Sequence, residues 1–143
     1  MPVVNTESYP GSRRYIETIK LELAANVKAI KGDFAITDGG RYAEPGRTDT
    51  GLTMLGRFAE TIDNTGGAAG AKSAKIRLSN DFWADGFLND TVAPVTAAHL
   101  WTDIYLKDSR TVTADGTGRT AAGKLVHIDT DMVYIKQIGR AHV

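Results

Sequence analysis

Apolar and polar residues alternate along several short segments of the chain, which is typical of β-strands with one buried face. The clearest case is the segment 73–78, in which Ala74, Ile76 and Leu78 alternate with polar residues. A second apolar run precedes it and extends from Leu52 to Ile62. We therefore interpret residues 51–78 as two strands joined by an elaborate turn, around which the remaining chain is organised.

Similar patterns predict further short strands on both sides of this pair. The segment 16–32 also fits helical spacing, but the short runs separated by Gly or Asx that follow it favour strands. We predict one helical turn at 96–99 with Thr96 as its cap, and a mobile loop at 109–120 around Val112. The further strands are expected at 18–23, 27–30, 34–36, 41–43, 82–87, 100–106, 124–128 and 132–138.

The resulting count is about eight to ten short strands, with turn signals every 8–12 residues and no convincing long helix. This pattern predicts an all-β protein, a single-domain antiparallel sandwich or barrel. The pattern does not distinguish a jelly roll from a small open barrel. We expect this domain to span residues 16–143, after an extended N-terminal arm formed by residues 1–15.

Composition narrows the range of partners. Lys and Arg number 17, as do Asp and Glu, so the formal net charge is zero. A neutral chain argues against nucleic acid as the main partner, because proteins that grip phosphates usually show a basic excess. No apolar run approaches the roughly 20 residues of a membrane span, and the N-terminal segment lacks the apolar region of a signal peptide. The chain has no cysteine, which excludes disulfides and thiolate metal sites.

The N-terminal arm carries side chains that are enriched where proteins meet, namely Tyr9, Arg13, Arg14 and Tyr15. It is either a partner-binding segment or a loose tail, since chain termini are often disordered.

The loop 63–71 joins the two central strands and is built from very small residues. Asp63 and Asn64 favour the start of a turn, while Gly66, Gly67 and Gly70 permit positive φ. Such a loop suggests backbone that closely approaches a ligand phosphate or a neighbouring subunit. The alternative is a solvent-exposed surface loop.

Motifs for catalysis or cofactor binding are incomplete. The segment 118–124, GRTAAGK, matches a phosphate-binding loop only up to Leu125, which stands where a metal-binding hydroxyl is required, and a strand pattern follows it. The loop 66–73 has Ala71 where the second glycine of that motif belongs. The histidines His99, His127 and His142 have no acidic neighbours at ligand spacing. We expect no catalytic residue, cofactor or metal.

Two further residue types have simple structural explanations. The pairs Asp81 with Asp85 and Asp129 with Asp131 are expected to be solvated turn carboxylates. The tryptophans Trp83 and Trp101 are expected in the β core. The open alternative is that one of them forms a stacking platform in a carbohydrate-binding module.

Three segments of the chain, 24–46, 51–83 and 111–138, resemble the head decoration proteins of tailed bacteriophages, also called capsid cement or capsid-stabilising proteins. The most specific parts are Gly56-Arg57, the loop 63–71, and Ala122-Gly123-Lys124 before the last hairpin. One departure is Ile30-Lys31-Gly32, where family members often place an aromatic residue before the glycine.

This resemblance implies a virion structural protein without catalytic activity. Such proteins bind the outside of an assembled icosahedral head, often as trimers at three-fold and quasi-three-fold positions, and cement neighbouring major capsid proteins. The implied partners are the major capsid protein and further copies of the chain, without direct contact to nucleic acid or membrane. The implied location is the capsid exterior, after synthesis in the bacterial cytoplasm. We then expect the loop 63–71 at a subunit interface and the arm on the capsid surface.

Overall fold

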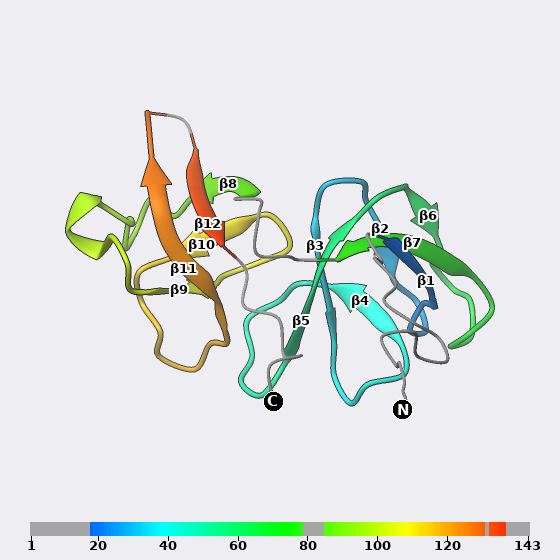
Figure 1. Cartoon of the computed structure of the whole chain (residues 1–143). Coiled ribbons are helices and arrows are strands. Elements are labelled where there is room, and N and C mark those ends of the chain that lie inside the picture. The colour runs from blue at the N-terminus through cyan, green and yellow to red at the C-terminus, as the bar shows by residue number, and fades with distance from the viewer. Residues whose placement is uncertain (1–17, 79–84, 131, 137–143) are drawn as a thin grey trace, which may run out of the picture.

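The computed structural model describes residues 18–78, 85–130 and 132–136. This part of the chain is all-β, with one 3₁₀ turn, and its strands pair mainly in antiparallel sheets, which confirms the predicted fold class (Figure 1). In chain order the elements are β1 (Thr18–Glu22), β2 (Lys28–Ala29), β3 (Phe34–Thr37), β4 (Ala43–Pro45), β5 (Thr53–Phe58), β6 (Ile62–Asp63), β7 (Ser73–Leu78), β8 (Asp85–Asn89), η1 (Ala97–His99), β9 (Asp103–Leu106), β10 (Thr111–Thr113), β11 (Ala121–Ile128) and β12 (Val133–Lys136).

The first half of the chain forms a five-stranded antiparallel sheet with the order β1-β7-β5-β3-β4. The short strands β2 and β6 pair separately beside it. The second half closes into a barrel with the order β10-β8-β12-β11-β9, in which β10 and β8 run parallel. Figure 1 shows the barrel on the left and the five-stranded sheet on the right.

Strand β3 contributes to two hydrophobic cores. All four of its residues are buried, because alternate side chains of the strand point to opposite faces and both faces are covered. Phe34 and Ile36 join the core shared with the barrel, while Ala35 joins the core on the other face of the sheet. The shared core contains Phe34, Ile36, Leu52, Met54, Phe87, Val95, Ile104, Leu106, Val112, Ala122, Leu125, Val133 and Ile135.

A β-bulge in β5 lets this neighbouring strand serve both cores as well. Ala35 pairs with Gly56 but Ile36 pairs with Met54, so Leu55 is the extra residue. Paired residues on neighbouring strands face the same side of a sheet, and the adjacent residues Ala35 and Ile36 face opposite sides. Their partners Gly56 and Met54 therefore also face opposite sides. Met54 accordingly packs in the shared core and Phe58 in the other one.

Most predicted strands are present in the described residues. The strand at 73–78, the strand beginning at residue 18, the first hairpin and the closing hairpin are confirmed. The helical turn is also confirmed, with the Thr96 hydroxyl accepting a hydrogen bond from Ala98 N at 3.3 Å. The expected arm and the segment 79–84 lie outside the described residues.

Three predictions of strand and loop positions were wrong. Residues 109–120 do not form a structureless loop, since β10 lies within them and Val112 and Thr113 are fully buried. The apolar run from Leu52 to Ile62 is not one strand but two, β5 and β6, which pair with different partners. The strand expected at 100–106 begins only at Asp103.

Candidate functional site

Asn64 organises the loop 63–71 from inside the protein. Its side chain is buried, and Nδ2 donates to Ala24 O at 3.0 Å and to Ala68 O at 3.1 Å. Its backbone N donates to Val27 O at 2.9 Å. One residue thus ties both sides of the loop to the turn that follows β1.

The glycines of this loop meet requirements within the chain. Gly66 has φ +77 and donates to Asn26 Oδ1 at 2.8 Å, while Gly70 N donates to Leu23 O at 2.9 Å. A Cβ on Gly67 would lie 2.1 Å from Asn64 Oδ1, so any side chain there would displace the Asn64 amide. The outer surface of the loop, with Ala68 and Ala69, is exposed. The structure therefore brings the predicted loop residues together, and the subunit interface stays a prediction.

Asp63 acts locally at the start of the loop. Its Oδ1 accepts a hydrogen bond from Thr65 N at 2.9 Å. Hydrogen bonds from the side chain and then the backbone of Thr65 hold the pKa of the Asp63 carboxyl below its usual range. The arm residues assigned to partner binding, Tyr9, Arg13, Arg14 and Tyr15, lie outside the described residues.

Replacing Asn64 with alanine is expected to lower the free energy of unfolding by about 2 kcal/mol, because buried carbonyl groups lose their donor. Urea denaturation measures this change. Asp63→Ala is the matched control, since Asp63 is exposed, and it should shift the urea midpoint much less. Equal midpoints for the two variants would contradict the organising role of Asn64.

The phosphate-loop-like segment is a turn followed by a strand, as predicted. Gly118 has φ +68 in the turn, and β11 begins at Ala121, whereas a phosphate-binding loop must open a helix. Lys124 belongs to that strand, and its Nζ lies 3.2 Å from Asp103 Oδ1. This lysine is therefore engaged in a surface ion pair.

The histidines and aspartates do not converge on a metal site in the part of the chain that the structure describes. His99 closes the capping box of η1 through Nδ1, and His127 lies exposed on β11 with its ring 5.4 Å from that of Tyr134. Asp129 accepts from Met132 N at 3.0 Å in the hairpin turn, as expected of turn chemistry. His142, Asp81 and Asp131 lie outside the described residues.

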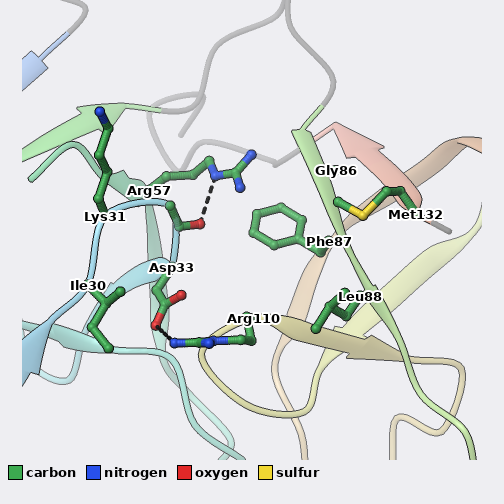
Figure 2. Close-up of a pocket in the computed structure, with 10 residues that line it drawn as sticks. Ile30, Lys31, Asp33, Arg57, Gly86, Phe87, Leu88, Arg110 and Met132 are labelled. Carbon is green, nitrogen blue, oxygen red and sulfur yellow. Dashed lines mark hydrogen bonds and ion pairs between the residues drawn. The ribbon is translucent and has the colours of Figure 1, made fainter.

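A cleft with a volume of about 250 Å³ lies where the five-stranded sheet meets the barrel (Figure 2). We call it the basic cleft. Its cationic lining residues come from three places in the chain, Lys31 before β3, Arg57 on β5 and Arg110 before β10. One carboxylate, Asp33, accompanies them. The complete lining is Ile30, Lys31, Gly32, Asp33, Arg57, Gly86, Phe87, Leu88, Arg110 and Met132.

The bulge in β5 places Arg57 in this cleft. Arg57 pairs with Phe34, so it shares the face that looks toward the barrel. Its guanidinium carbon lies 4.5 Å from the centre of the Phe87 ring, a cation–π contact, and its Nε donates to Gly32 O at 2.9 Å. Phe87 in turn stacks on Phe34, with ring centres 3.7 Å apart. The Arg57 side chain is thus held by the hydrogen bond of its Nε to Gly32 and by the contact of its guanidinium plane with the Phe87 ring.

On the other side of the cleft, an ion pair connects the two halves of the chain. Arg110 donates from a terminal guanidinium nitrogen to Asp33 Oδ2 at 3.2 Å. The Asp33 side chain is only 8% exposed, but that of Arg110 is 52% exposed. Figure 2 shows Arg110 reaching Asp33 below the Phe87 ring, with Leu88 and Met132 on the β8 side. Arg110 therefore keeps an open face toward solvent.

Trp101, which lies between η1 and β9, is a second unusual residue. We expected it in the core, but it is 68% exposed, and the neighbouring Leu100 is also exposed. Its φ is +69, a left-handed conformation that costs a bulky residue about 1–2 kcal/mol. Trp101 N donates to Leu125 O at 2.9 Å and Leu125 N donates to Thr102 O at 3.1 Å, which fixes this conformation. Trp83, the other predicted core tryptophan, lies outside the described residues.

Sequence reasoning found Trp101 but not its exposure, and it did not find the basic cleft. The three cations of the cleft are separated from one another by more than twenty residues, and no local pattern connects them.

Within the described ranges, no helix is both long enough and apolar enough to cross a membrane. The chain matches no protein-family model, no curated protein and no solved structure.

Proposed function

We propose that this chain is a virion structural protein that binds the outside of an assembled icosahedral phage head. It cements neighbouring major capsid proteins as a homotrimer at three-fold and quasi-three-fold positions, without catalysis and without direct contact to nucleic acid or membrane. Its location is the capsid exterior, after synthesis in the bacterial cytoplasm. The resemblance of the loop 63–71 and of Gly56-Arg57 to phage decoration proteins supports this proposal.

The observation that carries the proposal is the strained, exposed Trp101. A bulky residue in a left-handed conformation persists only where the surrounding structure enforces it, and such strain gathers at functional positions. Tryptophan is also among the residues that dominate the binding energy of protein interfaces. A rigidly presented, exposed indole is therefore suited to anchor the protein on another protein surface.

Trp101→Gly is expected to separate binding from stability. Glycine adopts φ +69 without strain, so the free energy of unfolding should stay within about 1 kcal/mol of the wild type or rise. Loss of an interface anchor of this type costs roughly 2 kcal/mol or more, or about thirtyfold in affinity. Co-sedimentation with purified heads that lack the protein measures binding, and urea denaturation measures stability.

Ile19→Ala is the matched control, because Ile19 is an exposed apolar residue on β1, in the other half of the fold. It should leave head binding unchanged. Full head binding by Trp101→Gly would remove Trp101 from the interface, and no head binding by the wild-type chain would overturn the proposed function.

The exposed Trp101 also favours a second candidate, a carbohydrate-binding module in which the indole stacks on a sugar ring. Glycan-array binding by the wild type that Trp101→Gly abolishes would support it. The apolar neighbour Leu100 argues for the protein partner, since a sugar site needs polar groups around its stacking platform.

A further inference from the structure

The basic cleft concentrates positive charge on a chain whose formal net charge is zero. Its described lining carries three cationic side chains and one carboxylate. A smaller hollow adjoins it and is lined by Lys31, Arg57 and Arg77 together with Gly32, Phe58 and Ala59. Concave surfaces lined by one sign of charge focus the electrostatic potential and attract groups of the opposite sign.

Lys31 is the least constrained cation of the cleft. It is exposed and lines both hollows. Several basic side chains of the described residues pair with carboxylates, as in Arg41 with Glu22, Arg47 with Glu44, Lys107 with Asp90 and Arg119 with Asp115. Lys31 has no such ion pair within the described ranges, so its ammonium group is available to a partner.

The other wall of the cleft is apolar. Leu88 is 46% exposed, and it lies beside Met132 and the edge of the Phe87 ring. An exposed leucine next to Arg110 fits a ligand that carries an acid beside an apolar group. Nucleic acid fits less well, because it requires a basic track along its backbone rather than one small hollow of about 250 Å³.

We propose that the basic cleft is a docking site for an acidic segment of the partner protein, with one carboxylate against Arg110, a second against Lys31 at the opposite end, and an apolar side chain against Leu88 and Met132. Arg110 contributes from its exposed face and stays paired with Asp33. The inference rests on the proposed function only in naming the capsid protein as the source of that segment. The docking chemistry itself is independent of the source.

The test is an NMR titration of the ¹⁵N-labelled full chain with a short peptide of alternating glutamate and leucine. We expect amide shifts at Lys31, Gly32, Leu88 and Arg110 with this peptide. A peptide of alternating lysine and leucine, and inorganic phosphate, should leave these amides in place. Lys31→Glu should weaken binding of the glutamate peptide about five- to tenfold, because an attractive charge becomes a repulsive one.

Lys20→Glu is the matched control, since Lys20 is also exposed but lies on β1, outside the cleft. It should bind the glutamate peptide like the wild type. Absence of shifts at the cleft, equal binding by Lys31→Glu, or shifts with phosphate that match those with the peptide would each overturn the docking site. Peptide binding together with failure to bind heads would instead overturn the proposed function and leave the docking site standing.

Discussion

Replacing Gly56 with alanine is expected to lower the free energy of unfolding by about 4 kcal/mol, a large part of the stability of a typical domain. Gly56 has φ +153 in the middle strand of the five-stranded sheet, between β7 and β3. An added Cβ would lie 2.0 Å from Arg77 O and 3.0 Å from Leu78 Cα. These are backbone atoms, so the clash can be relieved only by separating β5 from β7.

The loss should appear as a fall of roughly 10 °C or more in the melting temperature. Because the same bulge directs Arg57 toward the barrel, Gly56→Ala should also disturb the amides of the basic cleft. Gly51→Ala is the control: its φ is +73 but an added Cβ meets nothing within 4 Å, so only backbone strain of about 1 kcal/mol applies. A Gly56→Ala melting temperature equal to that of Gly51→Ala would refute the steric argument.

Replacing Asp90 with alanine is expected to cost about 3 kcal/mol at pH 7, because a buried carboxylate holds several donors together. Asp90 is 5% exposed and accepts from Lys107 Nζ at 2.5 Å, from the backbone N of Val92 and Ala93 at 3.1 Å, and from Thr113 Oγ1 at 2.8 Å. It thereby joins the end of β8 to β10. Urea denaturation at pH 7 measures the loss.

The contribution of Asp90 to the free energy of unfolding should also depend on pH. The ammonium group of Lys107 and then the amide of Val92 hold the pKa of the Asp90 carboxyl well below its usual range. A carboxyl with a lowered folded pKa stabilises the protein above its unfolded pKa, near 4, and loses this effect as the pH falls toward the folded value. The stability difference between wild type and Asp90→Ala should therefore be complete at pH 7 and shrink steadily below about pH 4.

Asp115→Ala serves as the control for Asp90, since Asp115 also has a lowered carboxyl pKa but is exposed in a surface turn. Its urea midpoint at pH 7 should stay close to that of the wild type. A difference between wild type and Asp90→Ala that stays constant from pH 7 to pH 2 would contradict the proposed role of the charge.

The strands that sequence predicts well are those whose burial pattern is local. Residues 73–78 alternate along their whole length, and the exposed lysine and buried isoleucine of β7 follow that alternation. In contrast, β10 contains only three residues and lies within a polar segment rich in glycine and threonine. Its burial depends on pairing with β8, which lies more than twenty residues earlier, as well as with the adjacent strand β9, so the local pattern alone does not indicate it.

Trp101 shows a second reason for failure. A tryptophan followed by strand-forming residues is typical of a buried strand, and Ile104 and Leu106 are indeed fully buried. The hydrogen bonds of Trp101 and Thr102 with Leu125 instead place the indole outside the barrel. These bonds involve backbone groups some twenty residues away, and backbone groups carry no signal in the amino-acid sequence.

The pattern of the chain is sufficient to predict an all-β fold and the positions of most strands and turns. The three-dimensional contacts show in addition that the glycines of the loop 63–71 meet internal requirements, that one bulge in β5 divides the side chains between two cores, that Lys31, Arg57 and Arg110 line one cleft, and that Trp101 is exposed. Alternation and turn chemistry act between neighbouring residues, whereas register, sheet closure and clefts arise from contacts between segments that are distant in sequence.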